Sequence, residues 1–124
     1  MADNNQSPAS SLPFSAAVRA GDFVFVSGQL AFNADGTLST GPIEEQTKIV
    51  LDGLKATIES QGCSMSDVVS CVCSLQDARD FSGFNTVYAT YFPENPPART
   101  THVAQHVLDA RVEIACTVYK PVIP

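Results

Sequence analysis

The sequence predicts a single α+β domain in which two helices pack on one face of a mixed β-sheet. Two observations support this prediction. Apolar residues recur at helical spacing in two segments, and five other short segments are rich in the β-branched and aromatic residues typical of strands. Along the chain these segments have the order β-β-α-β-α-β-β, which is typical of an α+β architecture. We expect one domain over residues 13–124, preceded by a flexible polar lead-in at residues 1–12.

The first half of the chain contains two predicted strands and the longer helix. Strands are expected at residues 14–19 and 23–30, joined by a turn at Ala20-Gly21-Asp22. Gly41-Pro42 opens the helix, because proline suits the first helical turn, and Gly62 ends it. Its apolar face consists of Ile43, Thr47, Val50, Leu51, Leu54 and Ile58, which recur at helical spacing.

The second half contains three strands and the shorter helix. Residues 68–75 are apolar enough to form a central strand. Asp80 is a favourable N-cap for the second helix, and Pro93 ends it. The predicted apolar side of this helix consists of Phe81, Phe84, Val87, Tyr88, Tyr91 and Phe92. The last two strands are expected at residues 99–106 and 111–119.

Composition excludes several functional classes. A net charge of −6 with only seven Lys and Arg disfavours nucleic acid as a partner, because binding a phosphate backbone depends on clustered cations. No apolar stretch approaches the ~20 residues of a membrane span, and the first residues do not resemble a secretory signal. We therefore expect a cytoplasmic protein with no membrane partner.

The four cysteines, Cys63, Cys71, Cys73 and Cys116, match neither a zinc site nor a Cys-x-x-Cys redox pair. Most of them lie in apolar strand segments, so we expect buried, reduced thiols. Neither a metal nor a cofactor is expected.

The alternation of the final strand leaves one side of the sheet without a cover. Val112, Ile114, Cys116 and Val118 can meet the helices, whereas the other row, which includes Glu113 and Ala115, faces away from them. A small sheet with helices on one side is often covered on its other side by a second copy. We expect a closed homo-oligomer with any site at the subunit boundary.

Arg99 is the strongest candidate for a binding residue. It follows the rigid pair Pro96-Pro97 and opens a predicted strand. A guanidinium directs two parallel N–H donors at a carboxylate, which a lysine cannot do. Arg99 can therefore anchor a small anionic ligand or form an intramolecular salt bridge, and its sequence context leaves both interpretations open.

The two histidines, His102 and His106, are predicted to lie on one face of the strand at 99–106, pointing away from Arg99. No cysteine or carboxylate joins them at ligand spacing, which favours packing or surface positions over a metal site. Either histidine could supply acid–base chemistry near neutral pH if the strand bulges.

Several short signatures occur in order along the chain and together resemble one family. They are Phe23-Val24-Phe25-Val26-Ser27-Gly28-Gln29, Glu44-Glu45-Gln46-Thr47, a helix with Asp80-Phe81, Asn85 and Tyr88, then Phe92-Pro93, Pro97-Ala98-Arg99-Thr100-Thr101 and Val112-Glu113-Ile114. The chain resembles the RidA (YjgF) family over nearly all of residues 12–119. The resemblance implies a chorismate-mutase-like subunit fold and a homotrimer with three clefts between subunits.

The resemblance also implies an activity. The best-understood members hydrolyse reactive 2-imino and enamine acids to 2-keto acids and ammonia. It implies that Arg99 binds the substrate carboxylate and that Thr101 and Ser27 contribute to catalysis. Further cleft positions that bind substrate fall on Phe14, Gly28, Asn85, Tyr88, Glu113 and Ala115.

Three positions depart from the family pattern. Phe14 stands where the deaminases have tyrosine, and Ala16 replaces the glutamine that follows. In the last strand Glu113 is kept, but Ala115 replaces a second glutamate that is thought to orient the attacking water. A carboxylate can take up a proton, and alanine cannot. The alternatives are therefore a non-catalytic trimer that binds a small carboxylate, or a specialised pathway deaminase or hydrolase with altered chemistry.

Overall fold

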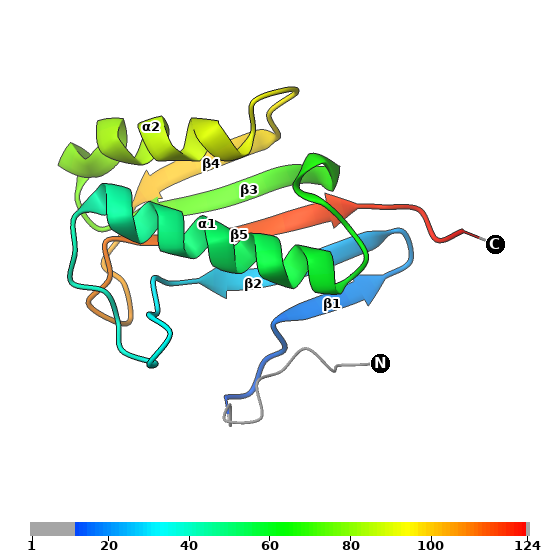
Figure 1. Ribbon diagram of the computed structural model, residues 1–124, viewed down its shortest axis with the longest axis horizontal. Coiled ribbons are helices and arrows are strands. Elements are labelled where there is room, and N and C mark those ends of the chain that lie inside the picture. Colours follow the sequence, from blue (N-terminus) through cyan, green and yellow to red (C-terminus); the bar gives the residue numbers. More distant parts are fainter. Residues whose placement is uncertain (1–11, 124) are drawn as a thin grey trace.

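A computed structural model describes residues 12–123 as a two-layer α+β domain (Figure 1). The elements are β1 (Ala17–Ala20), β2 (Phe23–Gln29), α1 (Ile43–Ser60), β3 (Val68–Leu75), α2 (Phe81–Tyr91), β4 (Ala98–Val103) and β5 (Val112–Tyr119). This order confirms the predicted β-β-α-β-α-β-β arrangement. Of the polar lead-in predicted at residues 1–12, all but Leu12 lies outside the described residues.

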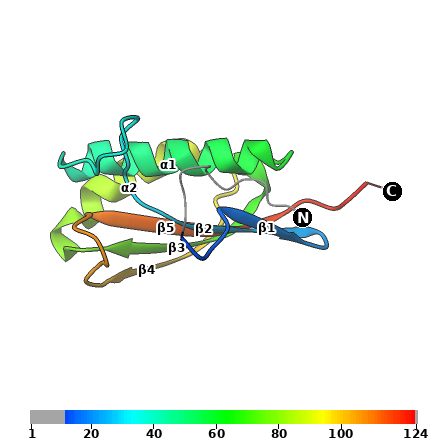
Figure 2. The same cartoon turned by 90° about the horizontal axis from the view of Figure 1, so that it is seen from below.

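The strands form one five-stranded sheet in the order β1-β2-β5-β3-β4. β3 and β4 are parallel, and the other neighbouring pairs are antiparallel, so the sheet is mixed as predicted. Both helices lie on the same side of this sheet (Figure 2). β4 is therefore an edge strand, with β3 on one side of it and no described strand on the other.

The core lies between α1 and the middle of the sheet. The whole predicted apolar face of α1, from Ile43 to Ile58, is buried, and so is the predicted inner row of β5. Pro42 occupies the N-cap position of α1 and forms no side-chain cap hydrogen bond, so packing of this apolar face is what stabilises the helix. Burial of apolar surface contributes about 25 cal/mol per Å².

The shorter helix departs from the prediction at its start. Asp80 occupies the N-cap position of α2, but its side chain makes no cap hydrogen bond and instead pairs with Arg111 at 3.1 Å. Asp77 caps the 3₁₀ turn (Ala78–Asp80) that precedes α2, by accepting from the backbone N–H of Arg79. Phe84 and Tyr88 are buried as predicted, whereas Phe81 is 45% exposed.

The strand predicted at residues 99–106 is shorter than expected. β4 ends at Val103, and residues 104–111 form a loop in place of the last strand residues. The prediction that His102 and His106 share one strand face is therefore wrong. The backbone N–H of His106 is bound by the side chain of Gln76, which holds this part of the chain in the loop. At the other end of the sheet, β1 begins at Ala17, so Phe14 precedes it.

The side of the sheet away from the helices is the open face. It presents Val18, Phe23, Phe25, Val72 and Tyr119, each between 39% and 51% exposed. Phe23 packs against Phe25 and Tyr119 with ring centroids 6.3 and 5.2 Å apart, which makes part of this surface continuous and apolar. The outward row predicted from the alternation of β5 is thus uncovered in a single subunit.

All four cysteines are free and buried, as predicted. Within residues 12–123, no helix is both long enough and apolar enough to cross a membrane.

Candidate functional site

The side chain of Arg99 lies among aromatic rings on the helix side of the edge strand β4. Its guanidinium carbon is 4.8 Å from the ring centroid of Tyr88, 5.3 Å from that of Phe84 and 5.7 Å from that of Phe81. Its Nη1 donates a 2.9 Å hydrogen bond to Oδ1 of Asn85. We call these five residues the Arg99 cluster. Cation–π contacts and one neutral acceptor fix the guanidinium without neutralising it.

Within the described part of the chain, Arg99 has no carboxylate partner. The ion pairs there engage Lys48, Arg79, Arg111 and Lys120. The intramolecular salt bridge that the sequence left open is therefore absent from the described residues. A guanidinium has five N–H donors, so Arg99 retains donors for an anion that approaches the sheet edge.

Two buried hydroxyl groups near Arg99 also lack an oxygen or nitrogen partner among the described residues. The hydroxyl of Thr101 forms no hydrogen bond, and the hydroxyl of Tyr88 has only the thiol of Cys71 beside it. Thr101 is two residues along β4 and shares the helix side with Arg99. Leaving a buried polar group unsatisfied costs about 1–3 kcal/mol, so such groups indicate a missing ligand or partner. Burial, followed by the neighbouring thiol of Cys71, raises the pKa of Tyr88, which keeps its hydroxyl protonated as a donor.

Three thiols lie in the core near the Arg99 cluster. Cys71 is the register partner of both Arg99 and Cys116, and Cys73 pairs with Thr101. Burial raises the pKa of Cys73 and Cys116 to about 12 and also raises that of Cys71. Because the thiolate is the nucleophilic form, these groups are unreactive near neutral pH.

The remaining predicted positions of β5 lie on the opposite side of the sheet. Glu113 and Ala115 line a hollow of about 360 Å³ together with Gly28, Val72, Ser74, His102 and residues 104–107. We call this hollow the open-face pocket. A methyl group on Gly28 would lie 2.6 Å from Oε2 of Glu113, so the absence of a side chain at Gly28 leaves room for this carboxylate.

Ser27 joins the bulge of β2 to the segment before β1. Its Oγ donates a 2.6 Å hydrogen bond to the carbonyl of Ser15, and its N–H donates to the carbonyl of Ala16. The hydroxyl proton is thereby engaged with backbone, while the oxygen lone pairs stay available. Phe14, in the segment that Ser27 holds, is 52% exposed.

The structure therefore divides the predicted site residues between the two sides of the sheet. Arg99, Thr101, Asn85 and Tyr88 lie on the helix side, whereas Glu113 and Ala115 lie on the open face. A single subunit does not bring the two groups together. Sequence reasoning missed Ser74, whose Oγ is 2.7 Å from Nε2 of His106 in the open-face pocket. The available signal was a serine at an outward position of a mostly apolar strand.

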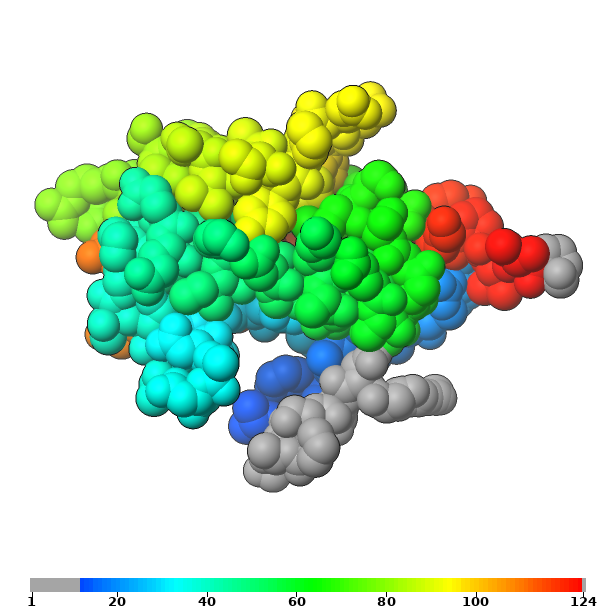
Figure 3. All heavy atoms as spheres, in the orientation of Figure 1, coloured from blue at the N-terminus to red at the C-terminus, as the bar shows by residue number. Residues whose placement is uncertain are grey.

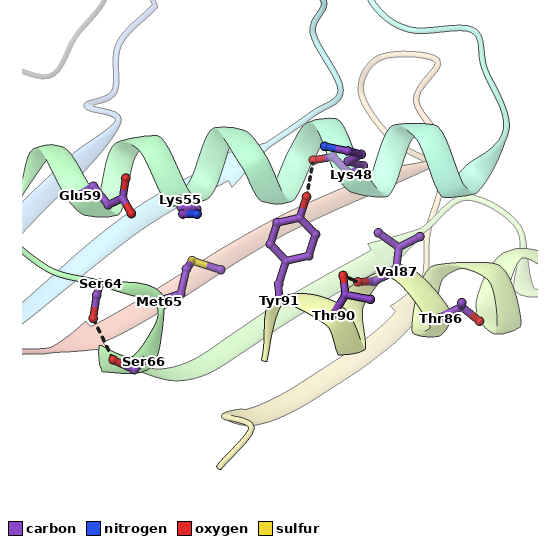
Figure 4. A pocket seen from close by; sticks show the side chains of 10 residues that line it. All are labelled: Lys48, Lys55, Glu59, Ser64, Met65, Ser66, Thr86, Val87, Thr90 and Tyr91. Carbon is purple, nitrogen blue, oxygen red and sulfur yellow. Dashed lines mark hydrogen bonds between the residues drawn. The ribbon is translucent and has the colours of Figure 1, made fainter. Parts of the chain in front are cut away.

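A hollow of about 680 Å³ lies elsewhere, between α1 and α2 on the outer surface (Figures 3 and 4). Tyr91 projects across it, and its hydroxyl donates to Asp52 at 2.6 Å. None of the predicted site residues lines this groove. Within residues 12–123, no group of three or more His, Cys, Asp or Glu side chains is arranged to hold a metal ion.

Comparison with known proteins gives a consistent result. The family model described as Endoribonuclease L-PSP matches residues 4–120. A RutC family protein of Pyrococcus abyssi is 39% identical over 110 residues, which is 87% of each chain. The 2-iminobutanoate/2-iminopropanoate deaminase of Dermatophagoides farinae is 38% identical over 104 residues, covering 82% of this chain and 81% of its own.

Solved structures agree with the sequence relatives. The crystal structure of RidA from the Antarctic bacterium Psychrobacter sp. PAMC 21119 superposes with a TM-score of 0.84 at 33% identity. The superposition covers 94% of this chain and 96% of that one.

Proposed function

Because the chain belongs to the RidA (YjgF) family, whose family model is described as Endoribonuclease L-PSP, we propose that it hydrolyses small 2-imino acids to 2-keto acids and ammonia. The observation that supports this most strongly is Arg99. It is a fixed guanidinium with no carboxylate partner in the described chain, and it lies at a sheet edge beside the buried, unpaired hydroxyl of Thr101. In this proposal Arg99 holds the substrate carboxylate through paired hydrogen bonds.

The site is completed at a subunit boundary. The Arg99 cluster and the open-face pocket lie on opposite sides of one sheet, so one small ligand cannot contact both within a subunit. Arg99 stands on an edge strand, and the open face presents exposed aromatic and aliphatic side chains. In a homotrimer, the edge of one subunit would lie against the open face of the next and cover that surface.

The chemistry requires positioning and proton transfer. Water adds to the carbon of the C=N bond, and the electron pair of that bond moves to nitrogen, which takes a proton. The resulting carbinolamine then expels ammonia as its oxygen forms the keto group and loses a proton. Holding the carboxylate fixes the carbon relative to water, and such positioning supplies much of the acceleration. Glu113 is the carboxylate that the open-face pocket offers for exchanging protons.

A non-catalytic trimer that binds small carboxylates is the second candidate. Ala115 and Phe14 favour it, because neither side chain can transfer a proton to or from a reacting group. Under this proposal Arg99 and Asn85 would bind the same ligand, and no imine would be turned over.

Cleavage of RNA, which the description of the family model names, has little support in the charge distribution. Of the seven Lys and Arg in the chain, Lys48, Arg79, Arg111 and Lys120 are in ion pairs. Nucleic-acid binding depends on clustered cations that are free to contact phosphates.

A cytoplasmic location is part of the proposal. Four free thiols fit a reducing compartment, because disulfides form and persist mainly in oxidising ones.

A competition assay tests the proposed function. An amino-acid oxidase generates 2-imino acids in the presence of semicarbazide, which traps them unless the protein hydrolyses them first. Wild type should suppress trapping, and Arg99→Ala should not. Failure of wild type to suppress trapping of short, branched and aromatic imines would contradict the deaminase proposal. Binding of a 2-keto acid that persists in wild type and is lost in Arg99→Ala would then favour the non-catalytic binder.

A further inference from the structure

The open-face pocket contains a hydrogen-bonded serine–histidine pair. Nε2 of His106 is 2.7 Å from Oγ of Ser74, and Nδ1 of the same ring is 2.7 Å from the carbonyl oxygen of Ala110. Ser74 lies on β3 directly beside Glu113 of β5 in the sheet register. All of these side chains except that of Ala110 line the pocket, and Ala115 leaves room beside them.

The partner of Nδ1 fixes the proton positions of this pair. A carbonyl oxygen only accepts hydrogen bonds, so Nδ1 must hold a proton. In the neutral ring Nε2 is then bare and accepts the hydroxyl proton of Ser74. The lone pairs of Ser74 Oγ remain free to accept from a water in the pocket. The arrangement therefore forms a directed path from water to Ser74 Oγ to His106 Nε2.

The loop that presents His106 is held firmly. The side chain of Gln76 accepts from the N–H of His106 at 2.8 Å, and its backbone N–H donates to the carbonyl of Arg111. The buried side chain of Gln46 accepts from the N–H of Arg111 at 3.0 Å. Asp80 pairs with the guanidinium of the same arginine. These bonds orient the imidazole before any ligand arrives, as a proton-transfer group requires.

We propose that Ser74 and His106 form the proton relay for the attacking water in the open-face pocket. This inference rests on the proposed imine hydrolysis. Ser74 contacts the water, and His106 acts through Ser74 as a positioning and proton-storing residue. An imidazole is suited to this role because it gains and loses a proton near neutral pH.

In the proposed reaction the relay transfers protons in two steps, addition of water and loss of ammonia. As the water oxygen bonds to the imine carbon, the water proton passes to Ser74 Oγ, and the hydroxyl proton of Ser74 passes to His106 Nε2. The C=N electron pair moves to nitrogen, which takes up a proton from solvent. In the second step the C–N bond breaks, and the remaining hydroxyl forms the keto group as it releases its proton to solvent. The proton stored on His106 returns through Ser74 to the departing ammonia.

Several charged and titratable groups lie near His106. Glu113 on β5 and His102 on β4 line the same pocket as His106. Asp109 and Arg111 belong to its own loop, and Arg111 is engaged with Asp80. A protonated imidazole cannot accept the hydroxyl proton of Ser74, so wild-type kcat/KM should be lower at acid pH.

Steady-state kinetics of three variants test the relay. His106→Gln and Ser74→Ala should each lower kcat by roughly 10²- to 10⁴-fold with little change in KM, because carboxylate binding by Arg99 is untouched. Both variants should also lose the acid limb of the pH profile. Ser66→Ala, the same change as Ser74→Ala at an exposed serine outside the pocket, should keep that limb. Ser74→Ala shortens a single side chain on a central strand, so it preserves the test if His106→Gln fails to fold.

The outcomes separate this inference from the proposed function. Active wild type with unchanged kcat and an unchanged pH profile in both relay variants would overturn the relay alone. Loss of activity through raised KM, with the acid limb intact, would also overturn it, because it would indicate a role in binding or structure. Inactive wild type would overturn the proposed function and the relay together.

Discussion

At the scale of single residues, Arg99 is held in place by groups that have no charge. Asn85 supplies one neutral acceptor, and Phe81, Phe84 and Tyr88 supply ring faces. A carboxylate in any of these places would occupy the guanidinium and compete with a ligand. The neutrality of the surroundings is therefore what keeps Arg99 available for an anion.

Asn85→Asp tests this argument. The new carboxylate would pair with Arg99, so binding of a small 2-keto acid should weaken by roughly 10- to 100-fold relative to wild type. Asn85→Ala should weaken binding less, because it only loosens the guanidinium. Isothermal titration calorimetry measures both affinities, with Thr86→Ala on the neighbouring exposed position as the control. Equal affinities for Asn85→Asp and wild type would show that Arg99 is not the anion anchor.

The buried thiols give stability a specific pH dependence. The pKa of Cys73 and that of Cys116 are about 12 in the folded protein, raised from 9.0 chiefly by burial. Above about pH 9 the unfolded chain loses thiol protons that the folded chain keeps, so unfolding becomes more favourable. The stability that these groups contribute is complete below pH 9 and is lost between pH 9 and 12.

Urea unfolding monitored between pH 7 and 10.5 should show the midpoint falling above pH 9. In the double variant Cys73→Ala/Cys116→Ala the free energy of unfolding should decrease less steeply with pH. The difference in slope should be up to about 1.4 kcal/mol per pH unit for each thiol removed. Identical slopes for this variant and wild type would contradict the raised pKa of these two thiols.

At the scale of elements, the regular segments were predictable, and the loop that positions His106 was not. The face of α1 from Ile43 to Ile58 and the strand Val68–Leu75 follow from periodicity, because burial on one side imposes a repeat on the sequence. The end of β4 depends on Gln46 and Gln76, whose amides bind the backbone of residues 104–111. Such contacts join distant parts of the chain and leave no local pattern, so the local sequence predicts a strand at His106.

The candidate site was predictable to a similar degree. Arg99 and Thr101 share a side of β4, as alternation predicts. Alternation also places Ala115 on the other side of the sheet, but the sequence alone did not relate that side to Arg99.

Shortening a buried side chain of α1 tests how this helix is stabilised. Leu54 is 1% exposed, and Leu54→Ala should destabilise the fold by about 2–5 kcal/mol because it leaves a cavity against the sheet. Lys55→Ala, on the outer surface of the same turn, should change stability by less than about 0.5 kcal/mol. Urea denaturation measures both. A small effect of Leu54→Ala would mean that α1 is held by something other than its apolar face.

At the scale of the whole molecule, the open face is the surface that a single subunit leaves uncovered. Phe25→Glu places a charge at the centre of its apolar residues and should convert a trimer into monomers or a weaker assembly. Ile123→Glu adds the same charge at an exposed position beyond β5 and should leave assembly unchanged. Sedimentation velocity distinguishes these outcomes. A trimer that withstands Phe25→Glu would place the interface elsewhere.

The central claim is that Arg99 of one subunit acts with the open-face pocket of another, and complementation between two inactive variants tests it most directly. Arg99→Ala removes the anchor, and Ala115→Phe fills the pocket. Each homotrimer should fail to hydrolyse imines in the semicarbazide assay. After co-refolding in equal amounts, roughly a quarter of the clefts in randomly mixed trimers combine an intact anchor with an intact pocket. The account predicts that activity returns to about this fraction of wild type. No recovery from trimers shown to be mixed would mean that both halves belong to one subunit and would contradict the account.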